Sequence, residues 1–297
     1  MSKWGFISPT GSFAQRKMLR HFKDRDTIYV SRTPGELELG RYVGSHKSVQ
    51  TVALETMLDD PTVENVYICT PTRSHFLTVH SCLDAGKNVL VEKTPSTSEH
   101  RVKDLVAMAK NKGLRLDVSC QCMNYMDRRE SLVRLGVHYA KSWMNLPLGG
   151  GTQLMAWDIA WYGVMLGSHL AGPLEYTARD FWKDDRIYHA GFDCPGLRYE
   201  MEFSDNARTF KQCTQYMGTR KGPNQAPGWS RPLMGATARK TNHSHHKPFT
   251  GPDEHPMYGH SITDFERKKP LMIDRVLRSM ETFAWLEKEC YDVDGTG

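Results

Sequence analysis

Short apolar runs that alternate with helical patterns dominate the first part of the chain. Runs of strand length occur at residues 4–7, 27–30, 49–52, 66–69, 88–91 and 114–119. Most of them are separated by apolar residues at helical spacing. Strands that alternate with helices are typical of a parallel sheet with helices on both faces. We therefore predict an α/β fold that begins with a doubly wound domain over residues 1–122.

Two of the predicted helices have recognisable ends. Residues 75–85 carry apolar side chains on one face, and Gly86 follows as a stop signal. Ser96 and Glu99 have the spacing of a capping box, which predicts that the next helix begins there and runs toward Gly113.

Polar residues follow two neighbouring strands of the predicted sheet. One strand ends in Thr70-Pro71, with His75 shortly after it, and the other ends in Glu92-Lys93. Ligands of open α/β sheets bind beyond the carboxyl ends of the strands. We therefore expect His75 and Lys93 to meet a cofactor or a substrate.

The loop after the first strand has features of a phosphate-binding turn. It reads Ser8-Pro9-Thr10-Gly11-Ser12-Phe13-Ala14. Gly11 and Ala14 match the second and third positions of Gly-x-Gly-x-x-Gly/Ala, in which glycines let backbone N–H groups approach a pyrophosphate. Pro9 occupies the first position. The same residues fit a turn before a surface helix, so the fingerprint alone does not separate the two interpretations.

Ser31 and Arg32 follow the second predicted strand, at the position where a dinucleotide-binding domain would bind the adenosine ribose. An acidic residue there would bind the 2′-hydroxyl of NAD, whereas a hydroxyl and a guanidinium suit the 2′-phosphate of NADP. We therefore predict NADP as the cofactor, with NAD as the alternative. A solvated arginine at a strand end is the competing interpretation.

The pattern changes after Met123. Residues 174–182 and 197–217 alternate as strands do, and Asp205-Asn206 divides the second stretch into a predicted antiparallel hairpin. A second, α+β domain with a mostly antiparallel sheet is expected over residues 123–297. The remaining expected elements are helices at 128–134, 152–166 and about 270–290, and a loop at 218–258.

Composition excludes several classes of protein. Of the 297 residues, 39% are hydrophobic and 25% are charged, and this hydrophobic fraction is large enough for a packed interior. The net charge is +5, and the basic residues are scattered rather than clustered, so no nucleic-acid partner is expected. The apolar segment 154–166 is interrupted by Asp158 and too short to span a bilayer, and the chain opens without an apolar leader. We expect a cytoplasmic protein without a membrane segment.

No metal site is expected. The seven cysteines contain no repeated Cys-x-x-Cys, which fits reduced thiols, and Cys120-x-Cys122 is interpreted as packing. The histidines of the later half lie in a Pro- and Gly-rich stretch without a carboxylate at helical spacing, which is a poor ligand set. They are residues 243, 245, 246, 255 and 260.

Several motifs taken together resemble the glucose-fructose oxidoreductase/inositol dehydrogenase (Gfo/Idh/MocA) family. They are Tyr67-Ile-Cys-Thr-Pro71 with His75, Ala85-Gly-Lys-Asn-Val-Leu-Val-Glu-Lys93 and Gly149-Gly-Gly151. The resemblance is clear over residues 3–122 and loose beyond them. It implies an N-terminal Rossmann domain that binds NAD(P), a C-terminal domain whose open sheet carries substrate and oligomer contacts, and hydride transfer on sugars or cyclitols. A small-molecule substrate and a homodimer or homotetramer formed through that sheet are therefore expected.

The chain departs from the family pattern at several positions. Thr94 replaces the proline of the Glu-Lys-Pro signature, and Thr72 replaces the asparagine of Thr-Pro-Asn-x-x-His. On the helix after the triple glycine the family carries an aspartate and, four residues later, a histidine; here these are Asp158 and Tyr162. Little room is expected between residues 134 and 149 for the family's long first strand of the second domain.

The strand ends and the resemblance together define the expected site. Catalysis is assigned to Lys93, which stabilises a developing alkoxide and exchanges its proton, and to Asp158 and Tyr162 as its helpers. The competing interpretations are a surface lysine bridging to a carboxylate, a polar face of a core helix and a packed tyrosine. Cofactor contacts are expected from Ser8, Thr10, Gly11, Ser12, Phe13, Ser31, Arg32, Thr70, Pro71, Thr72, His75, Glu92, Lys93 and Gln121. Substrate contacts are expected from Lys93, Asn124, Trp157, Asp158, Trp161 and Tyr162, although both tryptophans also fit core packing.

Three functions are compatible with these residues. The first is an NADP(H)-dependent oxidoreductase of a small polar carbonyl or alcohol. The second is a nucleotide-binding sensor or regulator that kept the fold and lost the reaction, which Pro9 and Tyr162 favour. The third is an imine or pyrroline reductase, whose protonated substrate needs less acid–base machinery.

Overall fold

The computed structural model divides the chain into two units, each described by itself. One unit comprises Met1–Gln121 and His255–Asp274, and the other comprises Cys122–Glu254 and Arg275–Gly297. Residues 255–274, which fall in the second domain of the sequence-based division, group with the first unit. The structure describes residues 3–11, 14–38, 48–119, 137–147, 177–183, 187–194, 197–207, 211–218 and 256–281.

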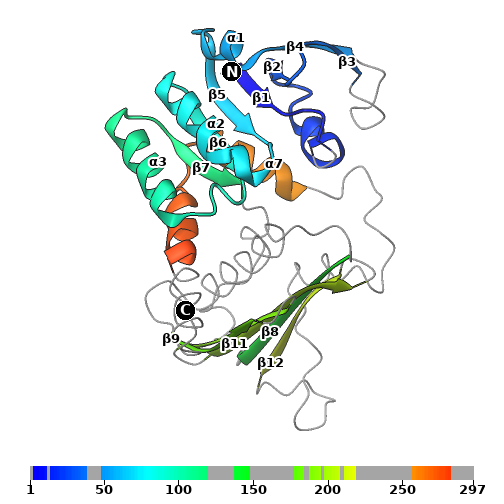
Figure 1. Cartoon of the computed structure of the whole chain (residues 1–297), viewed down its shortest axis with the longest axis vertical. Helices are drawn as coiled ribbons and strands as arrows, with labels where there is room; N and C mark the ends of the chain where they lie inside the picture. Colours follow the sequence, from blue (N-terminus) through cyan, green and yellow to red (C-terminus); the bar gives the residue numbers. More distant parts are fainter. Residues whose placement is uncertain are drawn as a thin grey trace. The chain divides into compact units, whose positions relative to one another are not determined.

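The first unit is built on a seven-stranded sheet with the order β3-β4-β2-β1-β5-β6-β7 (Figure 1). Neighbouring strands are parallel except for the edge pair β3–β4. The predicted doubly wound sheet is therefore confirmed, whereas the edge strand β3 was not predicted because it contains a single apolar residue. The strands are β1 (Lys3–Ile7), β2 (Thr27–Val30), β3 (Gly35–Glu38), β4 (Ser48–Val52), β5 (Val63–Ile68), β6 (Asn88–Glu92) and β7 (Leu116–Ser119).

The strand order reverses between β1 and β5. The chain runs from β1 to β2 and β4 on one side, and then returns to β5, β6 and β7 on the other. The loops that leave β1 and β5 therefore diverge at this point, after Cys69 N has donated a last hydrogen bond to Ile7 O at 3.2 Å. Such a switch point is where open α/β sheets bind ligands.

Two of the helices that cover the sheet begin at residues other than those predicted. The helix predicted from residue 75 begins three residues earlier, directly after Pro71, whose extended backbone precedes the first turn. The helix predicted from a Ser96–Glu99 capping box is instead capped by Ser98, because its hydroxyl is close enough to accept a bond from Arg101 N at 3.5 Å. The regular helices described are α1 (Leu54–Leu58), α2 (Thr72–Asp84), α3 (Glu99–Asn111), α7 (Pro256–Glu266) and a helix described over residues 273–281.

An aromatic cluster fills one face of the sheet. Phe22 lies edge-on to Phe6 with ring centroids 4.9 Å apart, and Phe6 lies 5.1 Å from Tyr67. The segment after β1 forms a π-helical turn, Ala14–Met18, and a 3-10 turn, Leu19–His21, that turn apolar side chains into this cluster. On the opposite face, α2 packs against β5 and β6, and α3 lies beside α2 (Figure 1).

Helix α7 completes the aromatic cluster although it comes from the far end of the chain. Ile262 and Phe265 are buried in the cluster. Glu266 accepts a bond from Trp4 Nε1 at 3.0 Å and is held at both carboxylate oxygens by Arg25, each at 2.8 Å. No helix was predicted in this segment, because its contribution to the core depends on strands more than 200 residues earlier.

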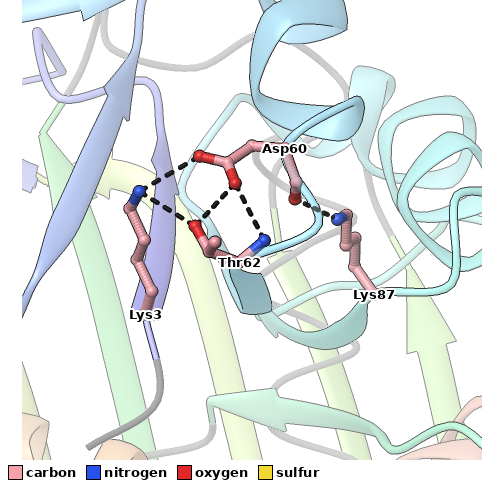
Figure 2. Close-up of polar contacts among 4 residues, drawn as sticks. All are labelled: Lys3, Asp60, Thr62 and Lys87. Carbon is pink, nitrogen blue, oxygen red and sulfur yellow. Dashed lines mark hydrogen bonds and ion pairs between the residues drawn. The ribbon is translucent and has the colours of Figure 1, made fainter.

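Polar contacts close the amino edge of the sheet. Lys3 Nζ donates to Asp60 Oδ2 at 3.1 Å and to Thr62 Oγ1 at 3.0 Å, and Asp60 Oδ1 accepts from Thr62 N at 2.8 Å (Figure 2). From the other side, the buried Lys87 donates to Asp60 O at 2.7 Å. The bonds from Thr62 and Lys3 to the Asp60 carboxylate lower its pKa to about 2, the bond from the Thr62 hydroxyl being the largest cause. Lys87 therefore has a structural role at the edge opposite to Lys93.

The second unit contains a five-stranded sheet with the order β12-β8-β11-β10-β9. Only the β8–β11 pair is parallel, which confirms the predicted mostly antiparallel sheet. The predicted hairpin is wrong, because β8 lies between β11 and β12. The expected shortage of room is also wrong, since β8 has 11 residues. The strands are β8 (Val137–Pro147), β9 (Thr177–Lys183), β10 (Ile187–Cys194), β11 (Leu197–Ala207) and β12 (Lys211–Gly218).

In the part of the chain that the structure describes, every helix is too short or too polar to cross a bilayer.

Candidate functional site

Lys93 lies at the carboxyl edge of the sheet, one strand away from the switch point. It directly follows Glu92, the last residue of β6, and it is half-buried. β6 is paired on both sides, with Val91 opposite Ile68 of β5 and Glu92 opposite Ser119 of β7. The end of β6 is therefore part of the rigid sheet, which fixes where the chain delivers Lys93.

Glu92 is buried, and its carboxylate is engaged inside the protein. Its side chain is 7% exposed and accepts a hydrogen bond from the hydroxyl of Tyr67. Ser119, at the end of β7, also hydrogen-bonds the Tyr67 hydroxyl. Burial, reinforced by the charge of Glu92, raises the pKa of Tyr67 well above its usual value, so the phenol stays protonated and donates to the carboxylate.

Cys69 lies beside the same carboxylate. Burial and the charge of Glu92 both raise the pKa of its thiol, so the thiol remains protonated. A protonated, largely buried thiol is a poor nucleophile. Cys69 therefore contributes packing at the end of β5.

His75 lies in the first turn of α2 and is 1% exposed. Its Nδ1 is 2.6 Å from the carbonyl oxygen of Thr94, and its Nε2 is 2.7 Å from the carbonyl oxygen of Thr70. The ring therefore bridges the loop that follows β5 and the loop that follows β6. Both of its nitrogens face the protein backbone.

The Thr70–Thr72 segment lies at the switch point itself. The hydroxyl of Thr70 is buried and makes no hydrogen bond to any described residue. Pro71 is exposed and precedes the first residue of α2. Buried hydroxyl groups normally have a hydrogen-bond partner. The Thr70 hydroxyl is therefore placed to form a hydrogen bond with a bound molecule.

The loop after β1 combines a left-handed residue with an open glycine. Ser8 has φ of +69°, a conformation that turns the chain away from the strand. A Cβ added to Gly11 would lie 3.8 Å from Ser8 O and 3.9 Å from Ala14 Cβ, which is ordinary contact. No described neighbour therefore requires a glycine at position 11. The missing side chain leaves room for a dinucleotide to approach the backbone of the loop.

Ser31 and Arg32 follow the carboxyl end of β2, next to β1 in the sheet. Ser31 is half-buried, and its hydroxyl accepts a weak bond from Thr33 N at 3.4 Å. Arg32 is exposed. The structure thus places a hydroxyl and a guanidinium on the β2 side of the switch point, the side of the adenosine ribose in doubly wound domains.

The remaining site residues of the sequence analysis lie outside the described residues and stay predictions. They are Ser12, Phe13, Gln121, Asn124, Trp157, Asp158, Trp161 and Tyr162. Tyr67 and Ser119 were missed by the sequence analysis. The signal was present, because Tyr67 stands between Val66 and Ile68 in the strand next to the one that ends in Glu92.

The sequence matches a known protein family over part of its length. Residues 11–120 match the family described as oxidoreductase family, NAD-binding Rossmann fold. The uncharacterized oxidoreductase YhhX of Escherichia coli is 47% identical over 64 residues, which cover 22% of this chain and 19% of YhhX. Human biliverdin reductase A is 38% identical over 73 residues, 25% of each chain. The D-xylose 1-dehydrogenase (NADP(+)) of Hypocrea jecorina is 42% identical over 60 residues, covering 20% of this chain and 15% of that enzyme. The chain thus matches a quarter or less of the length of these three relatives.

Solved structures share the fold over nearly the whole chain. The 3-ketoreductase KijD10 of Actinomadura kijaniata, solved with TDP-benzene and NADP, has a TM-score of 0.68 at 16% identity, covering 94% of both chains. The dehydrogenase MviM of Clostridium difficile has a TM-score of 0.70 at 13% identity, covering 98% of this chain and 99% of MviM. At these identities the likeness concerns the two-domain α/β fold. Residues 11–120 are thus similar to the NAD-binding Rossmann domain of the Gfo/Idh/MocA oxidoreductases.

Proposed function

We propose that this protein is an NADP(H)-dependent oxidoreductase that transfers a hydride to or from a small polar substrate, such as a sugar, a cyclitol or a related carbonyl or alcohol. The observation that carries the proposal is the position of Lys93. It directly follows the carboxyl end of β6, one strand from the switch point of a sheet that matches NAD-binding domains. A lysine at that edge is placed to meet a substrate beside a nicotinamide.

Lys93 supplies the chemistry that a hydride transfer requires from the protein. A bound nicotinamide provides or accepts the hydride, and the substrate oxygen gains or loses a proton in the same reaction. A lysine amine beside that oxygen stabilises the developing alkoxide and exchanges a proton with it. Asp158 and Tyr162 are proposed to relay that proton.

Two features support a dinucleotide at the switch point. The space at Gly11 and the buried Thr70 hydroxyl both fit a molecule bound across the ends of β1 and β5. Ser31 and Arg32 support NADP rather than NAD, because a guanidinium pairs with a 2′-phosphate. The relative named D-xylose 1-dehydrogenase (NADP(+)) and the NADP in the KijD10 structure point in the same direction.

Binding and turnover assays test the proposal. NADPH binding would be followed by fluorescence, and turnover would be measured in both directions across a panel of sugars, cyclitols and imines. We expect NADPH binding together with turnover of a sugar-like substrate. Binding without any turnover would instead favour a sensor or regulator, and turnover of imines alone would favour an imine reductase.

A Gly11→Ala variant is expected to fold normally but to bind NADPH at least about tenfold more weakly, because the added methyl group would meet the pyrophosphate rather than the protein. Thermal melting and fluorescence titration measure the two effects separately. Gly5→Ala is the matched control. Its Cβ would lie 2.7 Å from Met57 Sδ, so that variant should lose stability instead. If Gly11→Ala left the NADPH affinity unchanged, the loop after β1 would not be part of the cofactor site.

An Arg32→Glu variant is expected to weaken NADPH binding by about 10- to 100-fold, the worth of a hydrogen bond to a charged group, and to weaken NADH binding far less. The ratio of the two dissociation constants is the measurement. Lys23→Glu makes the same change of charge at an exposed lysine of the same unit and should leave the ratio unchanged. Equal weakening of both cofactors by Arg32→Glu would show that Arg32 does not read the 2′-phosphate.

A further inference from the structure

Lys93 is flanked in the sequence by two residues that the protein holds from opposite faces of the sheet. On the face of the aromatic cluster, Tyr67 donates to the carboxylate of Glu92. On the other face, which α2 covers, His75 contacts the carbonyl of Thr94 at 2.6 Å. The residue before Lys93 and the residue after it are therefore both fixed by side chains from elsewhere in the chain.

The two hydrogen-bond partners of His75 hold its ring between two loops. A backbone carbonyl oxygen only accepts hydrogen bonds, and both ring nitrogens lie within 2.7 Å of one. A neutral ring donates to one of these oxygens, and a ring with a hydrogen on each nitrogen donates to both.

Ionisable residues lie near both carbonyls that His75 contacts. Cys69 lies beside Thr70, and its thiol is held protonated. Glu92 and Lys93 directly precede Thr94, and on α3 Arg101 lies over the ring of Phe76, the residue after His75.

We propose that Tyr67 and His75 are positioning residues that clamp Lys93 from both faces of the sheet. The proposal rests on the assignment of Lys93 as the catalytic residue. Tyr67 fixes the residue before it through the carboxylate of Glu92. His75 fixes the residue after it and ties that residue to the switch-point loop through Thr70.

Kinetics test the clamp with two variants and two matched controls. Tyr67→Phe removes only a hydroxyl from a packed ring, and His75→Gln cannot reach both carbonyls with one amide. Each is expected to lower kcat by about 10- to 100-fold, because a small displacement of a catalytic group costs that much, with little change in the KM for NADPH. The controls are Tyr29→Phe, in the same aromatic cluster, and His80→Gln, exposed on the same helix. Variants that behave like their controls would overturn the clamp.

One measurement decides the clamp without any turnover. Amide exchange at Lys93 and Thr94 should accelerate in both clamp variants and stay unchanged in both controls. Unchanged exchange in the clamp variants would refute the clamp. If exchange accelerates but no substrate is turned over, the clamp stands and the proposed reaction fails.

Discussion

Replacing Lys93 with alanine is expected to lower kcat by about 10²- to 10⁴-fold, the range that general acid–base groups contribute, while NADPH still binds. The reason is positional. Lys93 directly follows a paired strand end, and the segments on both sides of it are held within the protein. Removing its amine therefore removes a proton donor and a positive charge without loosening the sheet. Steady-state kinetics and a fluorescence titration of NADPH measure the two quantities.

Two further variants separate chemistry from charge. Lys93→Arg keeps the positive charge, but a guanidinium does not release its proton, so its kcat should stay close to that of the alanine variant. Lys110→Ala removes an exposed lysine near the end of α3 and should behave as the unmodified protein. Undiminished turnover in Lys93→Ala would contradict the catalytic assignment. Recovery of activity by Lys93→Arg would instead assign Lys93 a purely electrostatic role.

Most strands of the first domain could be predicted because they contain short runs rich in apolar residues. Residues 27–30 and 88–91 are buried by the sheet and its covering layers, so their composition alone indicates a strand. The same alternation predicts that the strands are parallel, since parallel strands need crossover connections. β3 escaped prediction because it is an edge strand with exposed glutamates, where composition carries little signal.

Pairings between distant segments could not be predicted. β11 and β12 are neighbours in sequence, and Asp205-Asn206 suggested a hairpin turn, but both residues lie within β11 and β8 pairs with both strands. α7 has apolar residues whose burial depends on Trp4 and its neighbours at the other end of the chain. A single sequence contains no direct signal for either contact.

At the candidate site, the sequence predicted positions but not contacts. Strand ends placed Thr70, Glu92 and Lys93 at one edge, which the sheet topology confirms. Glu92 and His75 are expected to contact the cofactor, and this stays a prediction. The bond from Tyr67 to the Glu92 carboxylate and the contacts of both His75 nitrogens with carbonyls were not predicted. Such partners lie on other strands and loops, so their identity depends on register and on the way α2 packs.

Asp117 is a buried carboxylate that holds the start of a distant helix. It lies on β7 and is 8% exposed. Its Oδ1 accepts from Val118 N at 2.9 Å, Met272 N at 2.7 Å and Ile273 N at 2.9 Å. The last two amides begin the helix at residue 273, where N–H groups have no partner within the helix. Asp117 thus caps this helix from within the sheet.

Burial raises the pKa of Asp117 to about 6, although the three N–H bonds and the charge of Arg115 act in the opposite direction. Between the ordinary value of 3.8 and about 6, the folded protein therefore binds more protons than the unfolded chain. The free energy of unfolding must then fall as the pH rises through this window. A shift of about two pH units corresponds to roughly 3 kcal/mol.

An Asp117→Asn variant is expected to lose this pH dependence, because its amide oxygen still accepts the three N–H bonds and carries no charge. At pH 7 it should be at least as stable as the unmodified protein. Asp117→Ala removes the acceptor and should be destabilised at every pH by about 1–3 kcal/mol for each amide left without a partner. Urea unfolding between pH 4 and pH 8 measures these differences, with the exposed Asp24→Asn as the matched control. If the Asn variant and the unmodified protein lost stability in parallel across this range, the buried charge of Asp117 would not be its source.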